Sequence, residues 1–202
     1  MGRRTDARER MVLAARQLFR QQGYHATALS DVLELSEAPR GSVYFHFPNG
    51  KAQLAIEAAE LHARELVDFI NQVAQASGSA EGLVRAYVGL ARDNLVGSDY
   101  KNGCVLAPLV IEAARDTDEL GDVGHRAFSM IIDSLASHFA TFGMDTASAH
   151  TLADSVVAGV EGALVTARAL RSPSPFESVL AALEGQLAAL STVPSGAPVP
   201  TG

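Results

Sequence analysis

The sequence predicts an all-α chain with a short N-terminal head and a larger helical body. Apolar residues recur at three- and four-residue steps through most of the chain, which is the spacing of one face of an α-helix. Breaker clusters interrupt this spacing, as at Ser77-Gly78-Ser79 and Ser172-Pro173-Ser174-Pro175. No convincing strand and no internal repeat is seen. We expect a head over residues 1–50, a body over 51–191 and a disordered tail over 192–202.

The head should contain three helices that end at turn residues. The first covers TDARERMVLAARQLFRQQ, and Gly23 should end it as a C-terminal glycine does. A short second helix, ALSDVLELS, follows Thr27, whose hydroxyl can cap it. Pro39 is a residue favoured at the first helical position and should open a very short third helix. Pro48-Asn49-Gly50 should end that helix.

The body should be a succession of longer helices. One runs from Lys51 to about Ala76, and EGLVRAYVGLARDNLV and CVLAPLVIEAAR follow, the latter kinked at Pro108. The next starts near Asp116 to Asp118, ends at Gly143 and carries the apolar stripe Phe128, Ile131, Ile132, Leu135 and Phe139. A long helix over about Thr146 to Arg171 precedes a last helix with Phe176, Val179, Leu180, Leu183, Leu187 and Leu190 on one face.

Composition restricts the cellular setting. The chain has 202 residues, of which 48% are hydrophobic, but no apolar run approaches the 18 residues of a membrane span. The N-terminus MGRRTDARER lacks the apolar segment of a secretion signal. Cys104 is the single cysteine, which excludes an internal disulfide framework. We therefore expect a cytoplasmic protein with no membrane partner.

The net charge of −7 is unevenly distributed. Residues 1–52 carry eight basic and five acidic residues, a balance of +3, whereas the remainder carries eight basic and eighteen acidic residues, a balance of −10. A basic head on an acidic body fits a head that meets a polyanion. The alternative is that the charged residues only solvate helix faces and that their balance varies by chance along the chain. It would explain the difference between the two segments equally well.

The head has the layout of a helix-turn-helix unit within residues 5–47. In such units the second helix of the pair enters the DNA major groove with its N-terminal residues. Here those residues are Arg40, Gly41 and Ser42. Arginine can donate a bidentate pair of hydrogen bonds to guanine, and glycine allows the backbone to approach closely.

Four adjacent rings, Tyr44 to Phe47, follow this start and should divide by role. Val43 and Phe47 lie four residues apart on one helical face and can pack on the preceding helices. Tyr44 falls on the adjacent face, where its hydroxyl could reach a phosphate. Phe45 and His46 can lie against the sugar-phosphate edge or a thymine methyl group.

Lys51 opens the next helix, where a cation opposes the helix macrodipole. Free backbone N–H groups at a helix start, together with an adjacent lysine, form a phosphate-binding site. The alternative is a lysine that is merely solvated.

The stretch GYHATALSDVLELSEAPRGSVYFHFPNGKAQL, with MVLAARQLF before it, resembles the DNA-binding head of the TetR family of bacterial repressors. The family pattern of a Gly-aromatic pair, a following Thr, a Tyr-x-x-Phe reading helix and a Lys is matched by Gly23, Tyr24, Thr27, Gly41, Tyr44, Phe47 and Lys51. Pro39 stands where the family usually has Ser or Thr, and the PNGK turn is one residue longer than usual. These features, with NGCVLAPLVIEAA, are similar to the LmrA/YxaF-like branch.

The resemblance implies a homodimeric repressor that binds a palindromic operator and is released by a small molecule. The last two long helices of each chain would form a four-helix interface. The small residues Ala158, Gly159, Gly162 and Ala163 support this, because they would let another helix approach closely, although these faces could also complete the monomer core. The expected DNA-binding residues are Thr27, Ser30, Arg40, Gly41, Ser42, Tyr44, Phe45, His46 and Lys51.

The resemblance also implies a small-molecule cavity among the middle helices. Few polar anchors occur on the apolar faces there, which favours an apolar or aromatic ligand. Ordinary core packing is the alternative for each candidate. The candidate lining residues are Tyr87, Asn94, Cys104, Leu106, Phe128, Ile131, Ile132 and Leu135.

Other function classes receive less support. The six histidines fall in no H-E-x-x-H or cysteine-rich metal pattern, and no G-x-S-x-G, P-loop or dinucleotide fingerprint occurs. We therefore expect no catalysis, metal or cofactor, and a lone Cys104 beside Val105 and Leu106 is more often buried and inert. Three alternatives remain: a DNA-binding regulator without a ligand, a helical interaction module without a DNA role and, with less support, a small-molecule enzyme built on a helical bundle. The charge split and the residues around Tyr44 argue against the interaction module.

Overall fold

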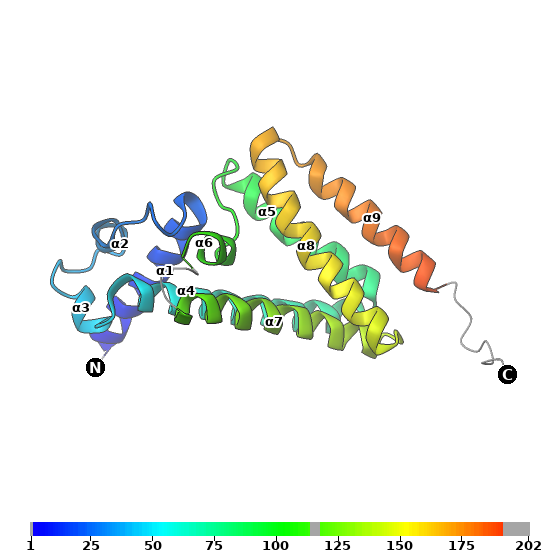
Figure 1. The fold of residues 1–202 in the computed structure, drawn as a ribbon, viewed down its shortest axis with the longest axis horizontal. Coiled ribbons are helices and arrows are strands. Elements are labelled where there is room, and N and C mark those ends of the chain that lie inside the picture. Colours follow the sequence, from blue (N-terminus) through cyan, green and yellow to red (C-terminus); the bar gives the residue numbers. More distant parts are fainter. Residues whose placement is uncertain (1, 114–117, 192–202) are drawn as a thin grey trace.

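The computed structural model describes residues 2–113 and 118–191, and every regular element within them is helical, as predicted. The predicted disordered tail lies outside the described residues. The head contains α1 (Gly2–Gln22), α2 (Leu29–Leu35) and α3 (Val43–His46). The body contains α4 (Gly50–Ser77), α5 (Ala80–Gly97), α6 (Leu106–Pro108), the π-helical turn η1 (Leu109–Ala113), α7 (Asp118–Thr141), α8 (Thr146–Leu170) and α9 (Ser174–Ser191) (Figure 1).

Local sequence explains where the long helices begin and end. The Ser79 hydroxyl caps α5 by accepting from the Gly82 N–H at 3.1 Å, and Asp145 caps α8 by accepting from the Ser148 N–H at 3.0 Å. Gly78, which follows α4, has a φ of +61° and so takes the left-handed conformation that glycine adopts at little cost. These termini lie within two residues of the predicted ones.

Two predicted boundaries are wrong in the head. The N-cap residue of α2 is Ala28 and not Thr27. The third helix begins at Val43 rather than at Pro39, because residues 39–42 close a tight turn first. In that turn both the backbone N–H and the hydroxyl of Ser42 donate to the Pro39 carbonyl, at 2.9 and 2.7 Å.

The kink expected at Pro108 takes the form of a change in helix type. Pro108 is the third residue of α6, where a missing N–H is tolerated, and the α-helical segment ends at this residue. The chain continues as the π-helical turn η1, a form often found where a helix is interrupted at a functional site.

One hydrophobic core extends from the head into the body, and α4 runs through both. Phe19 and Phe47 are fully buried in the head, and Leu54 of α4 packs in the same core. Further along, α4 packs against α5 and α7, while α8 packs against α7 and α9. Figure 1 shows α4 leaving the head and running beside α7. The position of the head therefore depends on α4.

Phe47 and Phe45 provide a matched test of this core. Phe47 is 0% exposed and Phe45 is 61% exposed, although they lie two residues apart. Phe47→Ala should lower the free energy of unfolding by roughly 3–5 kcal/mol, whereas Phe45→Ala should change it by less than about 0.5 kcal/mol. Chemical denaturation measures both. Equal losses would show that α3 is placed the wrong way round.

Candidate nucleic-acid interface and cavity

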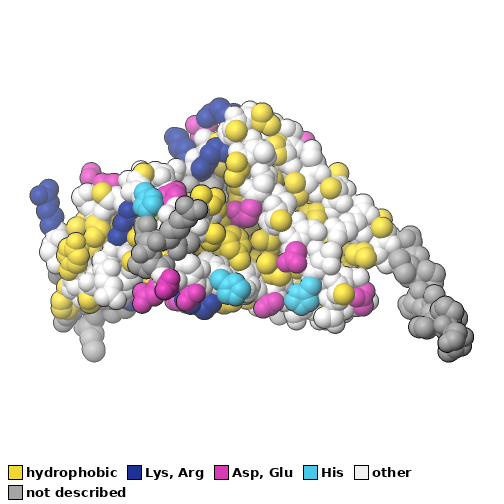
Figure 2. Space-filling model, in the orientation of Figure 1, with side chains coloured by type: hydrophobic (Ala, Val, Ile, Leu, Met, Phe, Trp, Pro, Cys, Tyr) yellow, Lys and Arg dark blue, Asp and Glu magenta, His cyan; other side chains and the backbone are white. Residues whose placement is uncertain are grey.

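The short helix α3 presents aromatic rings to solvent on the face opposite the core. Val43 and Phe47 are buried, whereas Tyr44 and Phe45 are 65% and 61% exposed, so the division predicted from helical spacing is confirmed. The Phe45 and His46 rings meet edge to face with centroids 5.0 Å apart. Figure 2 shows hydrophobic and basic side chains at the surface of this end of the molecule. Two adjacent exposed rings form a surface suited to contact with another molecule.

The turn before α3 is exposed together with these rings. Arg40 and Gly41 are exposed, and Ser42 is half-buried. A Cβ atom built on Gly41 would meet nothing within 4 Å, so the protein itself does not require a glycine there. The space in front of Gly41 is therefore open to an approaching partner.

The structure separates the two hydroxyl residues that were predicted as DNA contacts near α2. Ser30 lies exposed in the first turn of α2, as expected of a contact residue. Thr27 is 1% exposed, and its hydroxyl donates to the Gly23 carbonyl at 2.7 Å. The structure therefore places the Thr27 side chain inside the head, rather than on the surface expected of a DNA contact. The hydroxyl is turned inward because it closes the α1–α2 turn.

Lys51 is held against the α1–α2 turn. Its Nζ atom lies 4.4 Å from the centroid of the Tyr24 ring and donates to the His25 carbonyl at 3.3 Å. The side chain is half-buried, which differs from the alternative of a merely solvated lysine. The first turn of α4 and the turn before α2 are thus joined on the same side of the head.

A cavity of about 70 Å³ lies in the body between α1, α4, α5 and α8. Three of the predicted lining residues, Tyr87, Asn94 and Cys104, do line it. The other five do not line this cavity, because they pack in the core: Leu106, Ile131 and Leu135 are buried, and Phe128 and Ile132 pack against the core. Those five residues are a correction to the predicted ligand site.

Charged and polar side chains that the sequence did not reveal complete the cavity. They are Arg20 from α1, His62 from α4 and Glu161 from α8. The expectation of few polar anchors is therefore wrong. The sequence does carry a signal for Glu161, since it is the single charged residue between Val156 and Val165.

Burial governs the ionisation of these groups. Burial lowers the pKa of His62 from 6.5 to about 4, and the positive charges of Arg20 and Arg16 add to that shift. Burial also raises the pKa of Glu161, an effect that a hydrogen bond from the Cys104 thiol partly offsets. The pKa values of Cys104 and Tyr87 are raised by burial first and by the charge of Glu161 second. His62 is consequently neutral near pH 7, and Cys104 is a thiol rather than a thiolate.

The C-terminal end of α1 is bonded directly to the body beside this cavity. The Arg20 Nε–H donates to the Gly103 carbonyl at 2.9 Å, and the Gly103 N–H donates back to the Arg20 carbonyl at 3.0 Å. Arg168 of α8 also donates to the Arg20 carbonyl, at 3.1 Å. We call these contacts, with the Glu112 contact that follows, the α1 seam.

Glu112 of η1 forms the second part of the α1 seam. Its Oε2 atom accepts from the His25 N–H at 2.8 Å. Its Oε1 atom lies so close to Gly23 that a Cβ atom there would approach within 2.4 Å. A groove of about 310 Å³ follows the seam and shares Arg20, Gly103, Cys104, Glu161 and Leu164 with the cavity. The head is therefore joined to the body by α4 and by the seam.

Two family models match successive parts of the chain. The model described as bacterial regulatory proteins, tetR family, matches residues 12–58. The model described as transcriptional regulator LmrA/YxaF-like, C-terminal domain, matches residues 80–186. The chain belongs to the TetR family. It is a transcriptional regulator with a helix-turn-helix DNA-binding head and a body of the LmrA/YxaF-like type.

Relatives and solved structures agree with this TetR assignment. The chain is 38% identical over 177 residues to an HTH-type transcriptional regulator of Mycobacterium tuberculosis. The match covers 85% of this chain and 89% of that protein. It is 28% identical over 176 residues to the HTH-type transcriptional regulator LmrA of Bacillus subtilis, covering 85% and 91%. A TetR regulator from Legionella pneumophila has the same fold, with a TM-score of 0.80 at 21% identity over 88% of this chain and 95% of that one. All three of these proteins are named as transcriptional regulators.

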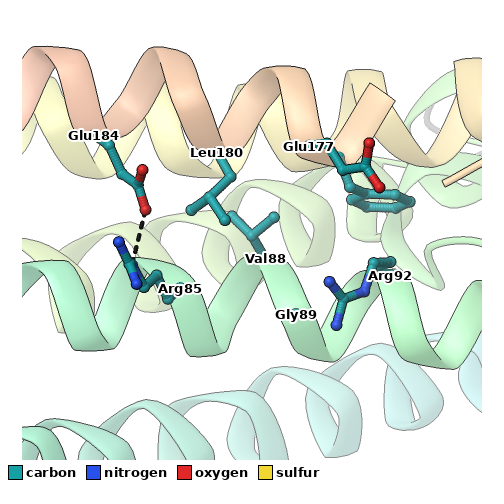
Figure 3. Close-up of a pocket in the computed structure, with 8 residues that line it drawn as sticks. Arg85, Val88, Gly89, Arg92, Glu177, Leu180 and Glu184 are labelled. Atoms are coloured by element: carbon teal, nitrogen blue, oxygen red, sulfur yellow. Dashed lines mark ion pairs between the residues drawn. The ribbon is translucent and has the colours of Figure 1, made fainter. Parts of the chain in front are cut away.

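Other features of this TetR body are less suited to a ligand. A groove of about 350 Å³ lies between α5 and α9 (Figure 3), but Arg85 within it is paired with Glu184 at 2.8 Å and with Glu81 at 2.8 Å.

Within residues 2–113 and 118–191, no group of three or more His, Cys, Asp or Glu side chains could hold a metal ion. None of the helices in those ranges is long and apolar enough to cross a membrane.

The depressed pKa of His62 predicts an acid-sensitive body. Between pH 6.5 and about 4 the unfolded chain binds a proton at His62 that the folded chain excludes. The free energy of unfolding should therefore fall by roughly 1–3 kcal/mol from this group as pH drops through that range. His62→Gln, which cannot be protonated, should show a shallower fall in denaturation measured across pH.

The control for this experiment is His150→Gln, at an exposed position of α8. This variant should retain the wild-type fall. A pH dependence that is the same in all three proteins would contradict the lowered pKa of His62.

Proposed function

We propose that the protein is a repressor that binds a palindromic operator as a homodimer and releases it when a small molecule enters the body. The observation that carries the proposal is the exposed aromatic pair Tyr44 and Phe45 beside the exposed turn at Arg40, on a helix whose other face is fully buried. A helix anchored in this way can present its outer face rigidly to a DNA groove.

The exposed and half-buried residues of this surface take the following roles in the proposal. Arg40 reads a base, because a guanidinium can donate two hydrogen bonds to guanine. Tyr44, Ser30 and Ser42 approach the backbone, and Phe45 and His46 lie against sugar or a thymine methyl group. Lys51 holds a phosphate near the start of α4, on the side where it already braces the α1–α2 turn.

The proposed dimer uses the outer faces of α8 and α9. Of the four small residues predicted there, Gly159 and Ala163 are used within the monomer: a Cβ atom on Gly159 would lie 2.8 Å from Val179 Cγ1, and Ala163 is 2% exposed. Ala158 and Gly162 remain exposed, and Val165, which is 67% exposed, extends the same exposed face of α8. This spacing of four and three residues makes a stripe along one side of α8, which supports packing against a second helix.

The proposed release of DNA acts through both connections between head and body. A ligand in the cavity lies against Arg20 and Gly103, which form the α1 seam. If the ligand prefers one arrangement of the seam, it shifts the population of head positions. The coupling must be reciprocal. Operator DNA should therefore lower the affinity for the ligand by the same factor by which the ligand lowers the affinity for operator DNA.

Substitution in the α8 stripe tests the dimer. Val165→Arg places a charge at the centre of the proposed interface and should convert a dimer into a monomer in light scattering coupled to size exclusion. Ala140→Arg, at an exposed position of α7, adds the same charge elsewhere and should leave the dimer intact. A wild-type monomer, or a Val165→Arg dimer, would contradict the proposed interface.

Arg40 and Lys51 should differ in how they affect DNA binding. Arg40→Ala should lose roughly 1–3 kcal/mol on the operator and little on unrelated duplex. Lys51→Ala should weaken binding to both duplexes and lower the salt slope by about 1 per phosphate contact in each chain. Titration of DNA from the upstream intergenic region, and of a scrambled duplex, at several salt concentrations measures both effects. An equal loss on both duplexes for Arg40→Ala would contradict base reading by Arg40.

A further inference from the structure

We propose that the cavity beside the α1 seam binds a small zwitterion, a molecule with an ammonium group and a carboxylate on an apolar body. Glu161 would hold the ammonium group and Arg20 the carboxylate. This inference rests on the proposed ligand-release function and names the chemical class of the ligand.

The first argument is that the cavity contains two opposite charges that are not paired. Within the described part of the chain, no carboxylate lies within 4.0 Å of the Arg20 guanidinium and no basic group lies within 4.0 Å of the Glu161 carboxylate. Arg20 donates its Nε–H to the Gly103 carbonyl, and Glu161 accepts from the Cys104 thiol. A partly buried charge without an ionic partner is unfavourable unless something else supplies the partner.

Several other arginines of the protein are paired with carboxylates. Arg8 pairs with Glu57 at 2.6 Å, and Arg16, one turn before Arg20 on α1, pairs with Glu65. In the α5–α9 groove, Arg85 pairs with Glu184 across the cleft (Figure 3). The cavity between α1 and α8 thus offers both of its charges to an external partner.

The second argument is that the two charges give the cavity opposite electrical poles. After burial, the charge of Arg20 is the largest cause of the lowered pKa of His62, so the potential is positive at that side. The charge of Glu161 is the second cause, after burial, of the raised pKa values of Tyr87 and Cys104. The potential is therefore negative at the side of the cavity where Tyr87 and Cys104 lie. A ligand with one charge of each sign matches both poles.

The third argument concerns the walls between the poles. Leu66, Leu90 and Leu164 line the cavity beside the Tyr87 ring, and they provide an apolar surface for the ligand body. The inner cavity of about 70 Å³ adjoins the groove of about 310 Å³, so a ligand can extend from one into the other. A purely apolar ligand would leave both charges dehydrated and unpaired, which disfavours it.

Three probes with one phenylethyl body separate the charge classes. L-Phenylalanine is the zwitterion, 2-phenylethylamine the cation and 3-phenylpropanoate the anion. Calorimetric titration of the protein without DNA, at neutral pH, should show phenylalanine binding about tenfold or more tightly than either of the others. Tightest binding of the amine or of the propanoate, or no binding of phenylalanine at millimolar concentration, would overturn the proposal.

Two charge-removing variants assign the poles. Glu161→Gln should weaken the binding of phenylalanine and of phenylethylamine by about tenfold and leave the binding of phenylpropanoate unchanged. Arg20→Gln keeps an N–H donor for the Gly103 carbonyl and should weaken phenylalanine and phenylpropanoate while sparing the amine. Glu177→Gln removes an exposed carboxylate of the α5–α9 groove and should change none of the three. A preference for phenylalanine that survives in both Glu161→Gln and Arg20→Gln would refute the assignment.

The experiment also distinguishes this inference from the proposed function. Binding is measured on the protein alone, and operator release is measured separately by adding phenylalanine to the DNA complex. Charge-dependent binding without operator release would keep the ligand class and refute the release function. Operator release by phenylalanine that persists unchanged in both variants would refute the ligand class and keep the release function.

Discussion

The reciprocal hydrogen bonds between Arg20 and Gly103 determine how the head sits on the body. The last carbonyl groups of α1 have no partners within the helix and need donors from elsewhere. The body provides them, since the Gly103 N–H and the Arg168 guanidinium both donate to the Arg20 carbonyl. The head helix is therefore completed by a loop and by α8, both of which belong to the other half of the chain. A change in that loop must be felt at the end of α1.

The same contacts explain why the ligand cavity and the DNA-binding surface can be coupled. Arg20 lines the cavity with its side chain and accepts the seam hydrogen bonds with its backbone. Three residues beyond it, Gly23 meets Glu112 and accepts the Thr27 hydroxyl, and the next turn residues meet Lys51 at the start of α4. This continuous chain of contacts leads from the cavity to the base of α2. It supplements α4, which runs from the core of the head into the core of the body.

Much of the fold was predictable, because helical periodicity and breaker residues are local signals. The separation of Val43 and Phe47 from Tyr44 and Phe45 followed from four-residue spacing alone. Local signals failed where a choice depended on distant partners. Thr27 looked like a cap, but the Gly23 carbonyl takes its hydroxyl. The stripe on α7 is apolar because it packs in the core, and Arg20, His62 and Glu161 meet in one cavity only after three distant helices have come together. The family resemblance suggested that a cavity exists, but its charges came from the structure.

Amide hydrogen exchange with and without operator DNA tests the α1 seam most directly. Exchange at the Gly103 and His25 amides reports opening of two of the hydrogen bonds in the α1 seam. The account predicts that DNA bound at α3 slows exchange at Gly103, although this residue lies in the body, because it selects one arrangement of the seam. Slower exchange confined to residues 24–51, with Gly103 unchanged, would contradict the account.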